Sequence, residues 1–377
     1  MTTLTTPPRR KKFYLFGYPI AHSAAPALHN LCFANWLTED VSPNTFELWS
    51  TSKVTDTMVE ALSGDDFGGS AVTMPLKAEI LSYLDDVSPE SRATGACNTV
   101  VKVSTGTGHK LVGQNTDILG IRNALLRALR SQFPGIHISS EASYSPSSGS
   151  GGVVIGGGAT TRSAVHALTL LGLSPLYLVN RDVTEVRAVQ DSFPHLDIIH
   201  LKNPDDVEAH LAQQDSPRIL MIVGAIPALA PVTSDERRVY STVSTILTIS
   251  YTKPAASSGL PIPKKRIFLE MAYKPRLTPM LQVAMAHGWH AVDGIQAMIE
   301  QGLAQQRMWY MSSSSLQVGS DPHIFSAELE KSVRELCEGM GDVVVDGEEV
   351  DRATGKESAV MPTCISTQFL GSDSGSR

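Results

Sequence analysis

Residues 153–172 read VVIGGGATTRSAVHALTLLG, and residues 175–181 read PLYLVNR. Three apolar residues that run into three glycines are typical of a buried strand that turns directly into a helix. Apolar residues then recur at helical spacing before Gly172 can end the helix: Ala164, Val165, Leu168 and Leu171. A second apolar run follows at 176–179. The order strand, helix, strand predicts a βαβ unit with parallel strands.

The glycines form the pattern GxGxxT, which predicts a dinucleotide site. Gly156 permits a tight turn, and Gly158 lets the backbone approach a pyrophosphate that rests on the free N–H groups of the helix start, near Ala159 and Thr160. The usual fingerprint ends in Gly or Ala, so we expect the bulkier Thr161 to push the helix slightly off the strand. The alternative is a glycine-rich turn in a sheet protein that binds no cofactor.

The end of the second strand, at Asn180, Arg181 and Asp182, is where an adenosine ribose would be read. Arg181 can pair with a 2′-phosphate or stack on adenine, whereas Asp182 favours a free 2′-hydroxyl. Asp182 followed by Glu185 also resembles a capping box for a helix at 183–193. Both interpretations stay open, and the choice between NAD and NADP is unresolved.

Composition limits the class of protein. The chain has 377 residues, 42% hydrophobic and 18% charged, which is a globular profile with room for two domains. The apolar run 219–232 is too short and too broken by proline to span a bilayer, and the N-terminus lacks a secretory signal pattern. A net charge of −7 argues against a nucleic-acid surface. We expect a cytoplasmic monomer or homodimer.

Four cysteines stand far apart, at Cys32, Cys97, Cys337 and Cys364. None forms a CxxC pair, and no cluster has metal-ligand spacing, so we expect neither a disulfide framework nor a structural metal. Their simplest role is that of small apolar residues in a reducing cytosol.

Strands and helices alternate along most of the chain. Ahead of the glycine turn we expect a strand at 13–16, a helix at 26–36, a strand-to-helix passage at 68–84, a strand ending at 100–101 and an amphipathic helix at 118–130. This alternation predicts an α/β domain of parallel strands. Further strands are expected at 196–201, 219–223 and 246–249, and a last helix at 325–340. We also expect a flexible insertion at 139–152 and a partly irregular insertion at 234–265.

Further short motifs occur in order around the βαβ unit: GYPIAHSAAPALHN (17–30), AVTMPLK (71–77), GACNT (95–99), GQNTD (113–117), EMAYKPRLTP (270–279) and DGIQAMIEQG (293–302). Their order and spacing resemble the shikimate/quinate dehydrogenase family over residues 13–312, and look most like its fungal branch. The resemblance implies an N-terminal α/β substrate domain and a Rossmann-type dinucleotide-binding domain with a cleft between them. The expected division is a flexible lead at 1–11, a substrate domain at 12–117 joined by 290–312, a nucleotide domain at 118–289 and a mostly disordered extension at 313–377.

The resemblance implies that Lys77 and Asp117 are the catalytic pair. Oxidising a secondary alcohol needs a group that takes the hydroxyl proton and a group that orients it. An unperturbed lysine titrates at about pH 10.4. It therefore needs a perturbed environment to act as this base near neutral pH. A nearby aspartate can hold the lysine, and the two then titrate as a unit. Taken alone, Lys77 would be an ordinary solvated helix residue.

Substrate contacts carry over from the family where the residues match: Ser23, Thr73, Asn98, Gln301 and Tyr273. Ordinary roles compete with these assignments, since Ser23 can begin a helix, Asn98 can serve a turn and Gln301 can be exposed on a helix. Core or turn roles are expected for His22 and His29.

Two positions depart from the family pattern. Ala25 stands where a second serine is usual, and Ala71 where an asparagine is usual. A lost hydrogen bond commonly costs about 0.5–1.5 kcal/mol, so we expect weaker binding of shikimate itself and a shift toward quinate or a related ring acid. Alternatives of other kinds are a catalytically silent metabolite sensor on the same fold and an enzyme acting on an unrelated small ketone.

Overall fold

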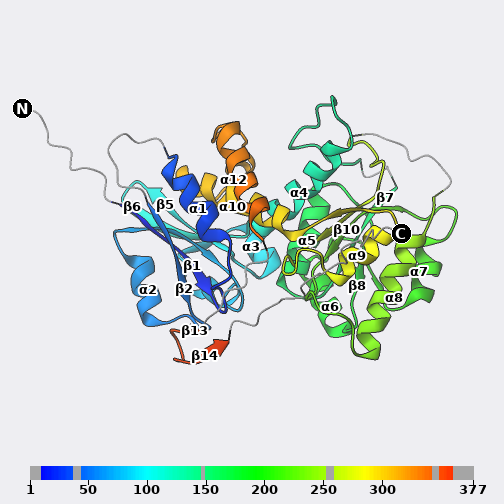
Figure 1. The fold of residues 1–377 in the computed structure, drawn as a ribbon, viewed down its shortest axis with the longest axis horizontal. Coiled ribbons are helices and arrows are strands. Elements are labelled where there is room, and N and C mark those ends of the chain that lie inside the picture. Colours follow the sequence, from blue (N-terminus) through cyan, green and yellow to red (C-terminus); the bar gives the residue numbers. More distant parts are fainter. Residues whose placement is uncertain (1–9, 37–43, 146–148, 252–258, 342–347, 360–377) are drawn as a thin grey trace, which may run out of the picture.

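Two six-stranded sheets, one in each lobe, form the framework of the chain (Figure 1). The computed structural model describes residues 10–36, 44–145, 149–251, 259–341 and 348–359. Residues 1–9 of the expected lead at 1–11, and the end of the chain at 360–377, therefore lie outside the described residues. No helix in the described part is long and apolar enough to cross a membrane.

The N-terminal sheet has the strand order β2-β1-β3-β5-β6-β4. Its strands are β1 (Lys12–Gly17), β2 (Thr45–Ser50), β3 (Phe67–Val72), β4 (Asp86–Val87), β5 (Thr99–Thr105) and β6 (Gly108–Gln114). β1 is parallel to β2 and β3, but β5 is antiparallel to both β3 and β6. The prediction of parallel strands throughout is therefore wrong for β5. Only two residues connect β5 to β6, and so short a loop can join only antiparallel strands.

Helices pack around this sheet: α1 (Ala25–Ala34), α2 (Asp56–Ser63), a 3₁₀ helix at Glu79–Tyr83, α3 (Pro89–Thr94) and α10 (Gly294–Tyr310). α10 docks through Trp309, whose indole N–H donates to Val100 O at 3.0 Å and whose ring lies 5.1 Å from that of Phe13. Gly69 on β3 makes room for this indole, because a Cβ there would lie 2.5 Å from Trp309 Nε1.

The second sheet is entirely parallel, with the order β12-β11-β10-β7-β8-β9. Its strands are β7 (Ser150–Ile155), β8 (Leu176–Val179), β9 (Ile198–Leu201), β10 (Arg218–Gly224), β11 (Ile267–Glu270) and β12 (His290–Val292). The order reverses between β7 and β10, as in doubly wound nucleotide-binding folds, and ligands bind at such a reversal. The glycine turn follows β7 and so stands at this point.

Helices cover both faces of the parallel sheet: α4 (Asp117–Ser131), α5 (Ala159–Leu170), α6 (Val183–Ser192), α7 (Pro204–Leu211), α8 (Ser234–Thr248) and α9 (Pro279–Ala286). The expected strand at 246–249 is wrong, and so is the irregular segment over 234–248. Apolar residues of α8 repeat on one buried face (Val239, Val243, Ile246 and Leu247), and Thr233 with Glu236 forms a capping box at its start.

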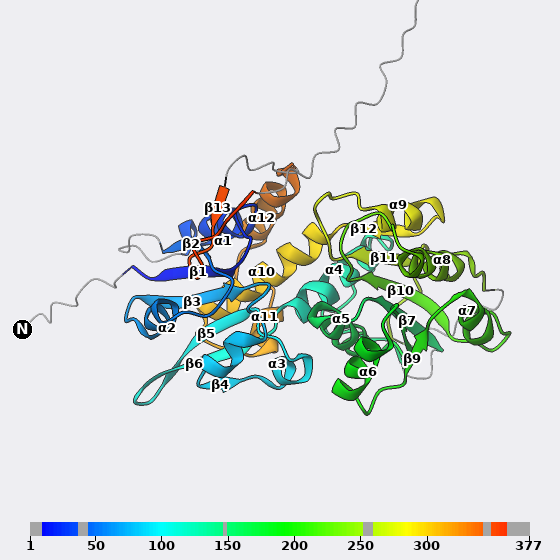
Figure 2. The same cartoon turned by 90° about the horizontal axis from the view of Figure 1, so that it is seen from below.

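α4 and α10 lie between the two lobes and contact each other (Figure 2). Gly120 on α4 permits the close approach, because a Cβ there would lie 2.6 Å from Ala297 O and 2.9 Å from Gln301 Cβ. This contact brings the end of the NTD motif (115–117) beside the returning helix.

The C-terminal extension has more structure than expected. It contains α11 (Leu316–Ser320), α12 (Ala327–Gly339) and a hairpin of β13 (Glu348–Val350) and β14 (Glu357–Ala359). The helix expected at 325–340 is confirmed as α12, whereas the expectation of disorder is wrong for α11 and for the hairpin. The insertion at 139–152 is likewise anchored: Tyr144 is buried and donates to Pro261 O at 3.1 Å, while residues 146–148 lie outside the described part.

The three cysteines that the structure describes, Cys32, Cys97 and Cys337, are buried free thiols, and Cys364 lies outside the described residues. Burial raises the pKa of the Cys97 thiol to about 12. Across the described ranges, no group of three or more acidic, histidine or cysteine side chains is arranged to hold a metal ion.

Candidate functional site

Lys77 and Asp117 meet in the cleft between the lobes. Lys77 Nζ lies 2.5 Å from Asp117 Oδ2, and the two side chains are 20% and 12% exposed. Lys77 comes from the loop after β3, where its carbonyl accepts from the backbone N–H of Cys97 at 2.7 Å. Asp117 is the first residue of α4. The loop and the helix start therefore bring together two charges that are 40 positions apart in the chain.

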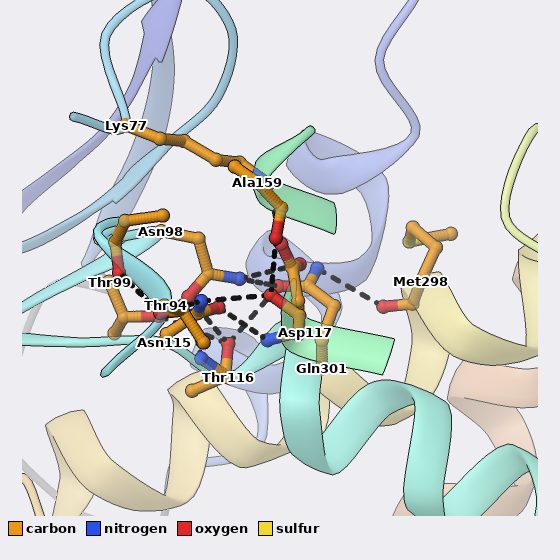
Figure 3. Close-up of polar contacts among 12 residues, drawn as sticks. Lys77, Thr94, Asn98, Thr99, Asn115, Thr116, Asp117, Ala159, Met298 and Gln301 are labelled. Carbon is orange, nitrogen blue, oxygen red and sulfur yellow. Dashed lines mark hydrogen bonds and ion pairs between the residues drawn. The ribbon is translucent and has the colours of Figure 1, made fainter. Parts of the chain in front are cut away.

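Asn98 fixes the second carboxylate oxygen of Asp117. Its side-chain amide donates to Asp117 Oδ1 at 2.8 Å, and its side-chain oxygen accepts from the Thr116 backbone N–H at 2.7 Å and from Thr99 Oγ1 at 2.8 Å (Figure 3). These partners leave the amide one orientation. Each oxygen of Asp117 is thus held by a different donor, so the carboxylate cannot rotate without losing one of them.

Gln301 on α10 completes the network. Its side-chain oxygen accepts from Asn98 Nδ2 at 3.2 Å and from Thr116 Oγ1 at 3.3 Å, and its amide donates to Met298 O at 3.2 Å (Figure 3). Gln305, one helical turn later, donates to Asn98 O at 3.1 Å. Gln305 is not among the residues expected from the sequence. The spacing of four residues from Gln301, which places both on one helix face, could have indicated it.

A cavity of about 240 Å³ opens over this network. Candidate residues from both lobes line it: Ser23, Thr73, Lys77, Asn98, Asp117, Thr160, Tyr273 and Gln301. Ala25, Ala71 and Leu15 supply an apolar part of the lining. Thr160 is the second residue of α5, directly after the glycine turn, so the cavity reaches the start of that helix.

Ser23 and Tyr273 line the cavity from the loop after β1 and the loop after β11. Ser23 Oγ also accepts from the Ala25 backbone N–H at 3.2 Å, so it supports the start of α1 while facing the cavity. Burial raises the pKa of the Tyr273 phenol, which therefore stays protonated at neutral pH. A neutral phenol next to a polar cavity can donate a hydrogen bond.

The two histidines of the first motif differ. His29 is fully buried in α1, burial lowers its pKa to about 3, and its Nδ1 lies 2.8 Å from Gln306 Nε2. It is a core residue. His22 lines the cavity, and burial followed by the charge of Lys274 lowers its pKa. Both imidazoles are therefore neutral at pH 7.

A second cavity, of about 300 Å³, lies at the glycine turn, and Gly156, Gly158, Asn180 and Arg181 are among its lining residues. Gly156 has φ of 134°, and a Cβ there would lie 2.7 Å from Ala225 O and 2.7 Å from Thr161 Oγ1. The absence of a side chain at Gly156 therefore gives Thr161 its space. Nothing lies within 4 Å of a Cβ built on Gly158, so the backbone is open there.

The charged residues that line this second cavity, which we call the groove, are paired with other side chains. Arg181 Nη1 lies 2.7 Å from Glu236 Oε1, and Asn180 Nδ2 donates to Glu185 Oε2 at 2.7 Å. Hydrogen bonds from the backbone of Thr233 and Val232, and then from Arg181, lower the pKa of Glu236 to about 2. Glu236 was not among the expected site residues, because only the tertiary structure brings α8 beside Arg181.

Asp182 caps a helix. Its carboxylate accepts from the backbone N–H of Thr184 at 2.7 Å and of Glu185 at 3.4 Å, at the start of α6. The reciprocal half of the expected capping box is not made, since the Glu185 side chain turns to Asn180. Asp182 is exposed and is not among the residues that line the groove.

These residues fit a dinucleotide. The turn follows a parallel strand at the sheet's reversal point, Gly158 leaves open backbone, and Ala159 and Thr160 begin α5, whose free N–H groups favour an anion. The groove at Asn180 and Arg181 continues from the turn.

Comparison with known proteins identifies relatives for both lobes. Residues 15–100 match the model of the shikimate dehydrogenase substrate binding domain. The chain is 35% identical over 304 residues to the pentafunctional AROM polypeptide of Schizosaccharomyces japonicus, a match covering 79% of the chain and 17% of the polypeptide. The chain therefore spans about a sixth of that relative's length.

Solved structures share the fold. The dehydroquinate dehydratase and shikimate dehydrogenase from S. pombe AroM is 31% identical with a TM-score of 0.63, covering 86% of this chain and 53% of that one. Mycobacterium tuberculosis shikimate dehydrogenase is 20% identical with a TM-score of 0.60, covering 88% of this chain and all of that one, and this likeness concerns the fold alone. The matched domain, the AROM relative and the two-sheet architecture together show that the chain belongs to the shikimate dehydrogenase family.

Proposed function

We propose that the chain is an NAD(P)-dependent dehydrogenase of the shikimate/quinate type. It exchanges a hydride between the cofactor and a ring hydroxyl or ketone of a cyclohexane- or cyclohexene-carboxylate. One observation carries the proposal: the Lys77–Asp117 pair, 2.5 Å apart, faces a cavity that extends to Thr160 at the start of α5, directly after the glycine turn. The cavity lining comes from residues 12–117, 290–312 and the nucleotide lobe at 118–289, in keeping with two domains around a cleft.

In this proposal Lys77 moves the proton. During oxidation the neutral amine takes the proton of the substrate hydroxyl, and during reduction the ammonium returns it. Asp117 holds Nζ in place, and Asn98 holds Asp117, so the lysine needs little reorganisation at the moment of transfer. The bound nicotinamide supplies or accepts the hydride. Gly156, Gly158, Ala159 and Thr160 would hold the pyrophosphate side of the cofactor.

The cavity suggests which ring acids bind. Ser23, Thr73, Gln301 and the Tyr273 phenol supply polar contacts to the ring and its carboxylate. Ala25 and Ala71 add none, so a substrate that needs two further donors at those positions binds less well; each lost bond costs about 0.5–1.5 kcal/mol. We therefore propose quinate or a ring acid with altered substituents ahead of shikimate.

One experiment tests the activity. The chain is incubated with quinate, shikimate and related ring diols, each with NAD and NADP side by side, and the absorbance of the reduced nicotinamide is followed. Turnover of at least one ring acid is expected. Binding of a ring acid in calorimetry with no turnover on the whole panel would instead favour a metabolite sensor, which the two alanines also favour.

Two properties of the whole protein are also proposals. We propose that it works in the cytoplasm and that it is a monomer or a homodimer, with a small molecule as its only substrate partner. Light scattering after size-exclusion chromatography tests the oligomeric state. A larger assembly would contradict this part of the proposal while leaving the proposed activity unaffected.

A further inference from the structure

The C-terminal hairpin, residues 348–359, is seated on the carboxyl end of β2 (Figure 1). The Arg352 backbone N–H donates to Ser50 O at 2.9 Å, and its guanidinium lies 4.6 Å from the centre of the Trp49 ring. Asp351 accepts from the backbone N–H of Ser52 at 2.9 Å and from its hydroxyl at 2.6 Å. The hairpin is thus fixed to β2, the edge strand of the N-terminal sheet.

From this position Glu349 reaches the segment between β1 and α1, residues 18–24, which we call the substrate loop. The carboxylate accepts from the backbone N–H of Ile20 at 2.8 and 3.1 Å and from that of Ala21 at 3.1 Å. Ser50 Oγ donates to the same carboxylate at 2.5 Å. Glu349 is 7% exposed, so these donors stand in for the water that burial removes.

The substrate loop forms part of the cavity. Ile20, His22 and Ser23 line it, and Ser23 is the candidate contact to the ring acid. Just beyond the residues that Glu349 holds, Lys274 Nζ donates to His22 O at 2.7 Å. The loop therefore has one anchor from the C-terminal hairpin and one from the loop after β11, and both act on its main chain next to Ser23.

We propose that Glu349 is a positioning residue for the substrate. By holding the N–H groups of Ile20 and Ala21, it fixes the path of the substrate loop and so the position of Ser23 relative to Lys77. The identity of the substrate rests on the proposed function, but the contact between hairpin and loop does not. The carboxylate lies on the substrate side of the cleft and touches no residue of the glycine turn, so its effect is confined to the ring acid.

The test uses full-length Glu349→Gln, which keeps the size of the side chain but places an amide N–H₂ among N–H donors. The expected result is a KM for the ring acid raised about tenfold, equal to about 1.4 kcal/mol, with kcat and the KM for the cofactor within about twofold of wild type. Hydrogen–deuterium exchange at Ile20 and Ala21 should accelerate as well. The matched control is Glu357→Gln, an exposed glutamate on the other strand of the hairpin, which should change neither readout.

A second variant guards against misfolding. Asp351→Ala loosens the hairpin from Ser52 without touching the loop, and it should raise the same KM and the same exchange rates by a smaller factor. Unchanged exchange and unchanged KM in Glu349→Gln would overturn the proposal. An equal rise in the cofactor KM would also overturn it, because it would indicate a general loss of structure. If the chain turns over no ring acid, faster exchange in Glu349→Gln still supports the contact, and only the proposed function fails.

Discussion

The two sides of the cleft differ in how their polar groups are satisfied before a ligand binds. On the substrate side, Lys77, Asp117, Asn98 and Gln301 form one connected network that faces a cavity. On the dinucleotide side, Arg181 is paired with Glu236, and Asn180 with Glu185, in separate contacts. The first arrangement holds the proposed reacting groups ready, whereas in the second Glu236 occupies Nη1 of Arg181, the nitrogen that a phosphate would have to share.

This difference predicts that the substrate side governs the rate of turnover, whereas the dinucleotide side governs which cofactor binds. A preorganised network stabilises charge at little reorganisation cost, so substitutions there should change turnover. Charged pairs near solvent are weak and exchange partners readily, so substitutions in the groove should change which cofactor binds and how stable the lobe is.

The largest effect is expected for Lys77→Ala. Removing the proposed general acid/base should lower kcat by roughly 100- to 10,000-fold, while the dissociation constant of the cofactor changes little. Steady-state assays and a fluorescence titration measure the two quantities. Lys12→Ala is the control, since Lys12 forms an ion pair with Asp66 on the N-terminal sheet, away from the lining of the cavity. Unchanged turnover in Lys77→Ala would remove the lysine from the mechanism.

The buried Glu270 provides a pH-dependent test on the dinucleotide side. It ends β11, is 1% exposed, and burial raises its pKa from 4.5 to about 7. Between these two values the unfolded chain has lost a proton that the folded chain keeps, so this group's contribution to stability falls as pH rises from 4.5 to 7 and is constant above.

Glu270→Gln removes that dependence. The variant's free energy of unfolding, relative to wild type, should rise by ~3 kcal/mol between pH 4.5 and pH 8. Urea denaturation at both pH values measures the double difference. A relative stability that does not change with pH would show that the carboxyl is ionised throughout and therefore hydrated.

A smaller effect is expected for Glu236→Gln. Without the carboxylate, Arg181 is free for a 2′-phosphate, and the repulsion between Glu236 and that phosphate disappears. The ratio of kcat/KM for NADP over that for NAD should rise about tenfold, which is about 1.4 kcal/mol. Asp235→Asn is the matched control, because Asp235 lies in the same turn and pairs with Arg238 instead. An unchanged ratio would mean that Arg181 does not read the 2′-position.

The smallest effect separates the two interpretations of Asp182. If it acts only as the cap of α6, Asp182→Ala should cost about 1 kcal/mol of stability and leave the cofactor KM unchanged. Thr55→Ala removes the cap of α2, on the other lobe, and should cost a similar amount. A rise in the cofactor KM specific to Asp182→Ala would assign the ribose contact to this residue after all.

Local patterns predicted β7, β8, β9 and β10 of the second sheet but missed its edge strands β11 and β12, and they predicted the N-terminal sheet less completely. Continuous apolar runs such as 153–155 and 176–179 depend only on burial of both strand faces, so they were correctly identified. The reversal at β5 was missed because the direction of a strand follows from its loop, and Gly106 with Thr107 was not interpreted as a tight turn. The run Ile246–Ile249 failed because four apolar residues fit a helix end as well as a strand.

The sequence alone determined where the strands on both sides of the glycine turn, the turn itself and the candidate lysine and aspartate lie, because spacing within a motif is a local property of the chain. Only the tertiary structure decided that Gln305 donates a hydrogen bond to Asn98, that Glu236 forms an ion pair with Arg181 and that Glu349 holds the substrate loop. These partners are separated by 207, 55 and 329 positions. No periodicity links residues so far apart, and their contacts exist only because packed sheets and helices place them side by side.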